Sequence, residues 1–224
     1  MSLSKWLFEV FPYLCVVAAV VGTWLRFRSR RFSVSSLSSQ FLENGKLFWG
    51  SVPWHYGILV VLSGHFLLFL FPSYFSWVTS DPRRLQFFEM ASLGFGLLSV
   101  WGGLVLLFRR MTDRRVKVVT NTMDLVILVL LIFQVSSGVL IAMIYRWGSS
   151  WYAASMVPYL RSLVWLQPDS SFVASMPWLV KAHITGAFLI IATVPFSRLV
   201  HFLSVPIGYL WRSPQVVIWN RKKA

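Results

Sequence analysis

Five long apolar stretches, separated by charged or turn-forming segments, dominate the pattern of the chain. They cover about residues 6–25, 53–71, 90–108, 125–145 and 177–205. A membrane-spanning α-helix needs about 20 mainly apolar residues, so each stretch predicts one transmembrane helix. Pro53 and Pro72 are taken as the ends of the second helix, because proline starts helices well and interrupts them badly. Pro195 predicts a kink within the fifth.

This pattern predicts an all-α integral membrane protein in which residues 1–224 form a single domain of five transmembrane helices. Composition agrees, since 57% of the residues are hydrophobic and only 12% are charged, whereas a soluble domain carries about 25% charged residues. A water-soluble monomer and a disordered chain are both excluded. A cleaved signal peptide is not expected at the N-terminus, because the basic residues follow the first apolar run instead of preceding it.

Basic residues predict the orientation. Five helices place the two termini on opposite sides of the membrane, and fifteen of the 21 Lys and Arg residues fall on one side. These are Arg26, Arg28, Arg30, Arg31, Lys46, Arg109, Arg110, Arg114, Arg115, Lys117, Arg198, Arg212, Arg221, Lys222 and Lys223. Because basic loops face the cytoplasm, the N-terminus is expected outside and the C-terminus in the cytoplasm. The net charge of +14 is thereby explained without nucleic acid.

The connection between the fourth and fifth stretches is rich in aromatic residues. It contains Trp147, Trp151, Tyr152, Tyr159, Trp165 and Trp178. We expect this outer connection to lie along the lipid headgroups, as Trp-rich segments do, with a lid over an outer site as the alternative. Cys15 is the only cysteine, which excludes an iron–sulfur centre within the chain, and no C-x-x-C-H run exists for covalent haem attachment.

The four histidines all fall on two of the five predicted helices. His55 and His65 lie on the second, and His183 and His201 on the fifth. Ionisable side chains at membrane depth are costly and typically functional. The two helices are antiparallel, because the second runs outward and the fifth runs back. His55 and His201 are therefore expected near the cytoplasmic face, and His65 and His183 near the outer face.

Two facing imidazoles are the axial ligand set of a b-type haem, and helical bundles build such sites from facing helices. The two pairs predict two b haems. In ideal helices the two histidine separations do not match. Ten residues separate His55 from His65, which is about 15 Å of helix and leaves the two side chains about 80° apart. Eighteen residues separate His183 from His201, which is about 27 Å. Tilt and the Pro195 kink are expected to absorb this difference.

Zinc and copper are disfavoured, since either metal needs a closer cluster that includes carboxylate or thiolate ligands. Four glycines lie near the predicted pairs, and two roles stay open for them. They either let a flat macrocycle approach the backbone or allow close helix packing. The glycines are Gly57, Gly64, Gly138 and Gly186.

The sequence resembles the gamma subunit of membrane-bound respiratory nitrate reductase, a five-helix di-haem cytochrome b. The most specific piece is PFSRLVHFLSVPIGYL, residues 195–210. WLR (24–26), HYGILVVLSGH (55–65) and DLVILVLLIFQVSSGVL (124–140) also match, as do the histidine spacings of ten and eighteen. The resemblance covers nearly the whole chain.

The resemblance implies a role for each of these positions. His65 and His183 match the ligands of the distal, outer haem, and His55 and His201 those of the proximal, cytoplasmic haem. Gly64 and His65 match the quinol site. Where the family has a functional lysine, this sequence has DPRRLQ (81–86), so Arg84 is the nearest match and Arg83 the next. Arginine keeps the charge but changes the donor geometry.

The resemblance further implies a membrane anchor in the inner membrane of a prokaryote, which oxidises quinol and passes electrons inward. The electrons continue through an iron–sulfur beta subunit to a molybdenum alpha subunit that reduces nitrate. One alternative is the di-haem anchor of another quinone-linked oxidoreductase, acting in sulfur or heterodisulfide chemistry or in nitrite oxidation. Another is a transporter that uses histidines as a proton relay. That class predicts acids in the bundle core, whereas Glu9, Glu89 and Asp124 lie near helix ends.

Overall fold

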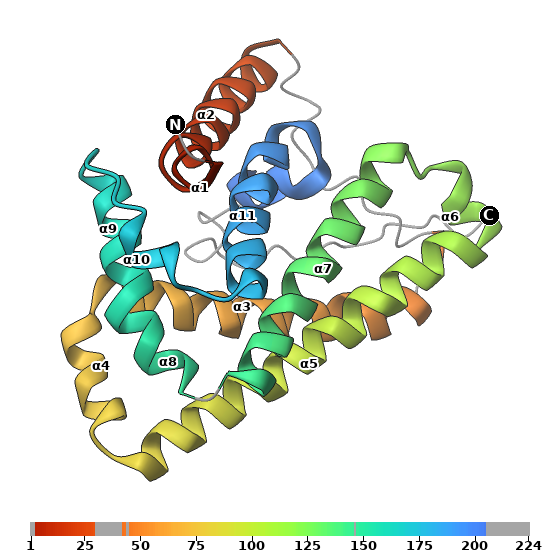
Figure 1. The fold of residues 1–224 in the computed structure, drawn as a ribbon. Coiled ribbons are helices and arrows are strands. Elements are labelled where there is room, and N and C mark those ends of the chain that lie inside the picture. The colour runs from red at the N-terminus through yellow and green to blue at the C-terminus, as the bar shows by residue number, and fades with distance from the viewer. Residues whose placement is uncertain (1–2, 30–41, 44, 146, 205–224) are drawn as a thin grey trace, which may run out of the picture.

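A computed structural model describes residues 3–29, 42–43, 45–145 and 147–204. Five helical stretches within this part are long and apolar enough to cross a membrane: Leu3–Ser29, Gly45–Leu70, Pro82–Thr112, Thr122–Ile144 and Trp178–Phe196. No strand occurs among the described residues. The predicted all-α fold with five spanning helices is therefore confirmed (Figure 1).

The five spans are numbered with the shorter helices between them. The first consists of α1 (Leu3–Lys5), the π-helical turn η1 (Trp6–Val10) and α2 (Phe11–Ser29). The others are α3 (Gly45–Leu70), α5 (Pro82–Thr112), α7 (Thr122–Ile144) and α11 (Trp178–Thr193). Between and after them lie α4 (Pro72–Thr79), α6 (Arg114–Val118), α8 (Gly148–Trp151), η3 (Tyr152–Met156), α9 (Val157–Val164), α10 (Ser171–Ala174), η4 (Val194–Phe196) and η5 (Arg198–Ser204).

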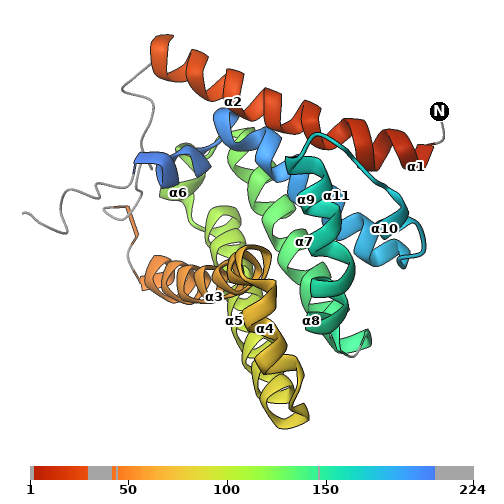
Figure 2. The same ribbon diagram turned by 90° about the vertical axis from the view of Figure 1, so that its left-hand side faces the viewer.

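The long helices pack in a different order from that of the sequence. α3 packs along α5, α5 along α7, α7 along α11, and α11 along α2, which crosses one side of the bundle (Figures 1 and 2). The two histidine-bearing spans, α3 and α11, are not among the closely packed helix pairs of the described residues. Side chains on α3 and α11 can therefore face each other across a space.

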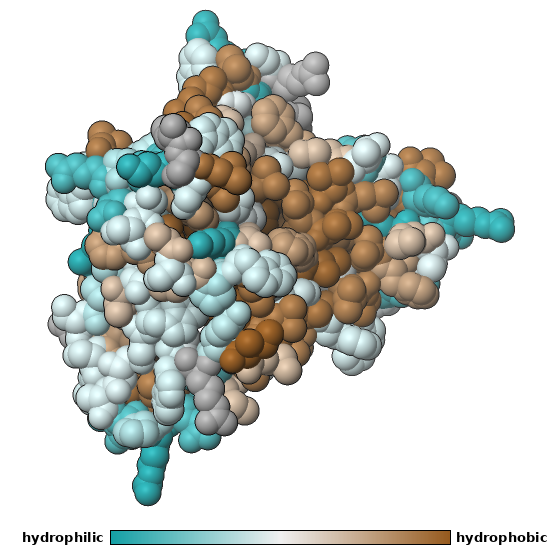
Figure 3. Space-filling view, in the orientation of Figure 1, coloured by the Kyte–Doolittle hydropathy of each residue, from teal (hydrophilic) through white to brown (hydrophobic). Residues whose placement is uncertain are grey.

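Two ends of the bundle differ in chemistry. We call one the basic end, because polar contacts there involve Arg26, Arg109, Arg110 and Arg198. We call the other the Trp end, after the residues Trp147, Trp151, Trp165 and Trp178 of the segment that joins α7 to α11. In Figure 3 the strongly apolar side chains gather over the middle and right of the face, and most of the strongly hydrophilic ones lie towards its margins. This distribution suits a bundle surrounded by lipid.

Polar caps fix several helix starts. Asp81 precedes α5 and its carboxylate accepts from the backbone N–H groups of Arg83 and Arg84, which lowers the pKa of Asp81. Asn121 precedes α7 and forms a reciprocal capping box with Asp124. Such caps satisfy the N–H groups that a first helical turn leaves unpaired.

The role predicted for Pro53 as a helix start is wrong. Pro72, by contrast, marks the end of the second span as predicted, since α3 ends at Leu70 and Pro72 begins α4. α3 starts at Gly45 and continues through Pro53. Tight packing of this part of α3 on α5 explains why the helix tolerates proline: a Cβ on Gly102 would lie 2.5 Å from the backbone nitrogen of Trp54. Packing along the neighbouring helix thus overrides the local cost of an internal proline.

The fifth span does not run as one helix to residue 205. α11 ends at Thr193, Pro195 lies in the 3-10 turn η4, and Ser197 is extended, with φ −119° and ψ 177°. The predicted kink is a full break, because proline lacks the N–H for the next helical bond and its ring clashes with the preceding turn. His201 lies beyond the break on η5. His201 therefore does not lie on a continuation of the helix that carries His183.

The Trp-rich connection folds back against the bundle. Tyr159 is fully buried and donates a hydrogen bond to the carbonyl of Phe8, at 2.8 Å. Arg161 donates to the carbonyl of Phe69 near the end of α3. Trp165 and Trp178, by contrast, stay about three-quarters exposed, at 75% and 76%. The segment thus has a buried middle packed on the bundle and strongly exposed tryptophans on either side of it.

Candidate functional site

The basic end brings His55 of α3 and His201 of η5 together. Their ring centres are 6.4 Å apart and their planes make an angle of 74°. A nitrogen–metal bond is about 2 Å long and the nitrogen lies about 1 Å from the ring centre, so two imidazoles on opposite sides of one metal have centres about 6 Å apart. The observed separation is one at which both imidazoles could hold the same metal.

The break after Thr193 makes this approach possible. Ten residues separate His55 from His65 and also separate His183 from Thr193, which is about 15 Å of helix in each case. Beyond Thr193 the chain changes direction instead of continuing along the axis of α11. The break therefore removes the mismatch between the two histidine spacings.

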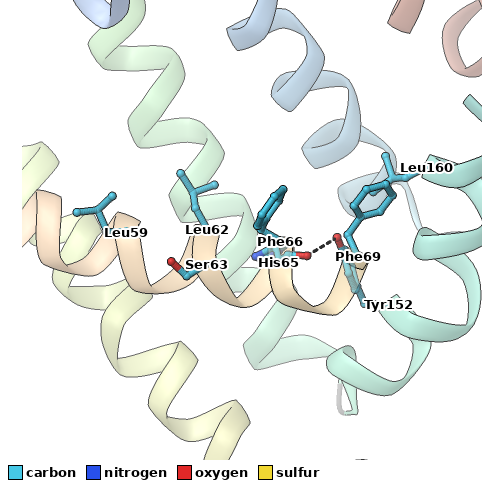
Figure 4. A pocket seen from close by; sticks show the side chains of 8 residues that line it. All are labelled: Leu59, Leu62, Ser63, His65, Phe66, Phe69, Tyr152 and Leu160. Atoms are coloured by element: carbon cyan, nitrogen blue, oxygen red, sulfur yellow. Dashed lines mark hydrogen bonds between the residues drawn. The ribbon is translucent and has the colours of Figure 1, made fainter. Parts of the chain in front are cut away.

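At the Trp end, His65 lies on α3 and His183 on α11. The ring of Tyr152 packs edge-on against His65, with centres 5.3 Å apart, and its hydroxyl lies 3.4 Å from the His65 carbonyl (Figure 4). Sequence reasoning treated Tyr152 only as one of several aromatic residues in the connection. Its contact with His65 depends on the folding back of that segment.

The hydrogen bonds of the rings assign their tautomers. Nδ1 of His55 lies 2.7 Å from the Ser51 carbonyl, and Nδ1 of His65 lies 2.8 Å from that of Val61. His201 Nδ1 likewise lies 2.7 Å from a carbonyl, that of Arg198. A carbonyl only accepts, so Nδ1 carries the proton and Nε2 carries the lone pair. Metal-ligating histidines have this arrangement.

His183 is held by α7 instead of by its own helix. Ser137 Oγ donates to the Gln134 carbonyl and therefore acts as the acceptor for His183 Nδ1, at 2.9 Å. The Gln134 amide donates to the His183 carbonyl and lies 3.2 Å from both ring nitrogens. A Cβ on Gly138 would lie 3.0 Å from Cε1 of the His183 ring. The absence of a side chain there makes room for the ring.

Gln134 and Ser137 are residues that sequence reasoning missed. The available signal was their polarity within an otherwise apolar span, which marks functional positions in membranes. Gly57 and Gly186 pack closely: a Cβ on Gly57 would collide with Ser99 and with the Phe95 carbonyl, and one on Gly186 would lie 2.5 Å from the Gln134 side chain. Helix packing is thus the observed role of Gly57.

A groove of about 500 Å³ runs beside His65 (Figure 4). Its volume lies within the usual range of small-molecule sites. Apolar side chains dominate its lining, and Ser63, His65 and Tyr152 are the polar members. The complete lining is Leu59, Leu62, Ser63, His65, Phe66, Phe69, Tyr152 and Leu160.

The residues predicted to bind quinol are distributed around this end without all meeting in the groove. Gly64 leaves room, since a Cβ there would meet only Phe88, at 3.7 Å. Arg84 lies one helical turn before Phe88 on α5, with its guanidinium 4.1 Å from the centre of the Trp77 ring. Its buried Nε has no hydrogen-bond partner among the described residues. Arg83 is exposed, and neither arginine lines the groove.

The donor set and its surroundings fit haem. His55 and His65 are exposed although both lie on an apolar spanning helix. Uncovered imidazoles are costly at membrane depth, so a bound group that covers them and takes their Nε2 lone pairs would resolve the conflict. Within the described parts of the chain no three His, Cys, Asp or Glu side chains cluster as ligands. Each pair instead offers two ligands, as a haem requires of its protein.

Comparison with known proteins agrees with this arrangement. The family model described as "Nitrate reductase gamma subunit" matches residues 4–220. The "Nitrate reductase gamma chain" of Bacillus subtilis (strain 168) is 31% identical over 210 residues, covering 92% of this chain and 94% of its own. The "Respiratory nitrate reductase 1 gamma chain" of Escherichia coli (strain K12) is 29% identical, with coverage of 96% and 97%. This chain belongs to the nitrate reductase gamma subunit family.

Proposed function

We propose that the chain is the membrane anchor of a nitrate reductase complex, which oxidises quinol at the Trp end and carries electrons to the basic end. The approach of His55 and His201, with ring centres 6.4 Å apart, is the observation that supports it most directly. The pairs lie at different depths, so a redox group at each would form a path along the bundle. Family membership supports the same role.

Two b haems are the proposed cofactors. His55 and His201 would hold one at the basic end, and His65 and His183 the other at the Trp end. Bound haems would supply one-electron carriers that accept the electrons of quinol singly. The protein fixes the tautomer of each histidine, because each Nδ1 has an oxygen acceptor. Nδ1 therefore keeps the proton, and Nε2 is left with the lone pair that a metal ligand needs.

A visible spectrum of the purified protein tests this directly. We expect a reduced b-type haem signal corresponding to two haems per chain. A folded preparation without haem would overturn the proposal and would favour the transporter class. Two haems with no reduction by any quinol analogue would leave the cofactors in place but remove quinol oxidation from the function.

The quinol site is proposed beside Gly64 and His65, with Arg84 as the charged donor and Arg83 as the next candidate. Arg84 Nε lies 3.7 Å from an Asp81 oxygen, and its geometry there is not that of a hydrogen bond. A quinol oxygen could accept from it, and such charge-assisted bonds strengthen as the quinol loses its first proton. The proton would leave on the side of the Trp end.

Replacement of Arg84 tests this assignment. Arg84→Ala should slow reduction of both haems by a quinol analogue about tenfold or more, the effect of losing roughly 1.4 kcal/mol from a charged hydrogen bond. Both haems should stay bound and reducible by dithionite. Arg83→Ala is the matched control, one position away on the same turn. Slowing in the control and not in Arg84→Ala would move the site to Arg83.

The basic end is proposed to face the cytoplasm and the soluble subunits, first an iron–sulfur beta subunit and then a molybdenum alpha subunit. Fifteen Lys and Arg residues on that side support this orientation in the inner membrane of a prokaryote. Six of them, Arg30, Arg31, Arg212, Arg221, Lys222 and Lys223, lie outside the described residues. A reporter fused after Ala224 should be active only in the cytoplasm, and labelling of that terminus from outside intact cells would contradict the orientation.

A further inference from the structure

The segment that carries His201 is a short 3-10 helix beyond a break, which by itself is a weak support for a metal ligand. Runs of 3-10 helix have poorer hydrogen-bond geometry than α-helix, and the break interrupts the hydrogen bonds of α11. Two neighbouring helices compensate for this. Their contacts show which residues control the position of the ring.

α2 holds the break itself. Arg26 Nη1 donates to the carbonyls of Pro195 and Ser197, at 2.7 and 2.8 Å. One turn earlier on the same face, Gly22 allows close approach, since a Cβ there would lie 2.7 Å from the Pro195 side chain. These contacts satisfy carbonyls that the break leaves without helical partners.

α7 holds the other side of the segment through Asp124. This carboxylate is almost fully buried, and its Oδ1 lies 2.7 Å from Nε of Arg198. Its Oδ2 accepts from Arg110, at 3.3 Å, and from the backbone N–H of Asn121. Arg198 also donates from Nη2 to the Val119 carbonyl, at 3.0 Å. The Arg198 guanidinium is therefore held at two points, by Asp124 in the first turn of α7 and by Val119 just after α6.

Arg198 transmits this anchorage to His201. Its own carbonyl is the acceptor for His201 Nδ1, at 2.7 Å, so the backbone that Asp124 immobilises is the backbone that orients the imidazole. The resulting angle between the His201 and His55 planes is 74°. A buried ion pair resists displacement, because moving either partner leaves an uncompensated charge.

We propose that Asp124 is a positioning residue for His201, acting through Arg198 to fix the plane of that imidazole. Its carboxylate contacts Arg198, Arg110 and the Asn121 backbone, and its proposed action on the ring runs through Arg198. This inference rests on the proposed haem ligation and goes beyond it by assigning control of ligand orientation at one end to a carboxylate on a different helix. None of the hydrogen bonds and ion pairs of Asp124 described above is to His65 or His183, so the Trp-end pair should be independent of its charge.

Asp124→Asn is the decisive variant, since asparagine keeps the size and an acceptor for Asn121 but removes the charge that holds Arg198. Asp113→Asn is the matched control: Asp113 caps α6 in the same connection and does not bond Arg198. The EPR spectrum of each oxidised haem reports the angle between its imidazole planes, and a redox titration gives its midpoint potential. A merely structural role for Asp124 would not move these readouts at one haem alone.

We expect Asp124→Asn to retain two haems per chain while shifting the EPR signal and midpoint potential of the basic-end haem only. The spectrum of His201→Ala identifies which signal that is. An unshifted basic-end signal, or equal shifts at both haems, would overturn the inference. If Asp124→Asn does not accumulate as folded protein, Arg198→Lys is measured instead, and the same shift of the basic-end haem alone is expected. Lysine keeps the charge but cannot contact Asp124 and Val119 together. A wild-type protein without haem would overturn the proposed function instead.

Discussion

The basic end and the Trp end hold their histidine pairs by different means. On the α3 side both rings bond carbonyls one turn back on their own helix. On the other side α7 supplies the support at both ends, directly from Ser137 to His183 and indirectly from Asp124 through Arg198 to His201. The support is neutral in one case and ionic in the other.

Depth explains this difference. Asp124 lies in the first turn of α7, whereas Ser137 lies thirteen residues further on, about 20 Å into the span. A charged network is tolerated near a helix end, but deep in the hydrocarbon it would be costly, so a hydroxyl and an amide take its place. One helix can thus orient two ligands if the chemistry of its side chains follows the depth.

Replacing a histidine should give the largest difference in haem content between the two ends. His55→Ala and His201→Ala should each abolish the same haem, reducing the content from two per chain to one, because a bis-histidine site needs both ligands. His65→Ala and His183→Ala should each abolish the other haem. Haem content and EPR of the four variants measure this. Loss of different haems in His55→Ala and His201→Ala would break the pairing.

Filling the space beside His183 should damage only the Trp end. Gly138→Val adds atoms where a single Cβ would already lie 3.0 Å from the ring, so the imidazole must move and at least half of the Trp-end haem should be lost. Gly94→Val on α5 is the control, since nothing lies within 4 Å of its Cβ position. Equal haem loss in both variants would indicate a general effect of valine on helix packing.

The buried pair Glu43–Arg109 offers a test of stability at the basic end that leaves the haems alone. Arg109 is only 2% exposed, and its Nε donates to Glu43 at 2.6 Å. Glu43→Gln should lower the free energy of unfolding by about 1–3 kcal/mol, since the buried Arg109 guanidinium then loses its charged acceptor. Thermal unfolding in detergent or lipid measures this, with Glu89→Gln at the Trp end as the control.

Acid should act on the same pair. Burial by itself raises the pKa of the Glu43 carboxyl. Hydrogen bonds from the Lys46 backbone and the Arg109 side chain lower it by more, so the pKa lies below its ordinary value. The pair therefore contributes its full stability above the ordinary pKa of a glutamate, and that contribution is lost as the pH falls through the lowered value. Glu43→Gln should lack this loss, and an identical acid profile in both proteins would contradict the assignment.

The smallest effect is expected from Tyr152→Phe. The variant keeps the ring against His65 and removes only a hydrogen bond of 3.4 Å, long enough to be weak, so a change of about 0.5 kcal/mol or less is expected. Burial raises the pKa of Tyr152 to about 12, so this difference should stay constant through neutral and mildly alkaline pH. Tyr152→Ala should have the larger effect on the Trp-end haem, because it also removes the lining of the groove.

Much of the architecture follows from the sequence alone. The five spans are determined by uninterrupted apolar length, which a bilayer demands of any helix that crosses it. The choice of His55, His65, His183 and His201 follows from the cost of ionisable groups in such spans, and their grouping into two pairs follows from antiparallel direction. These inferences need only chain order and hydrophobicity, and the helix spans agree with them.

Only the tertiary structure decided how the rings are brought together and held. Pro53 stays inside α3 because close packing on α5 outweighs the local preference of proline, while at the Pro195 break Arg26 from α2 bonds the released carbonyls. The support of His183 by Ser137, and of His201 by Asp124, joins residues 46 to 77 positions apart in the chain. Contacts of this kind depend on the spatial order of the helices, which hydrophobic periodicity does not encode.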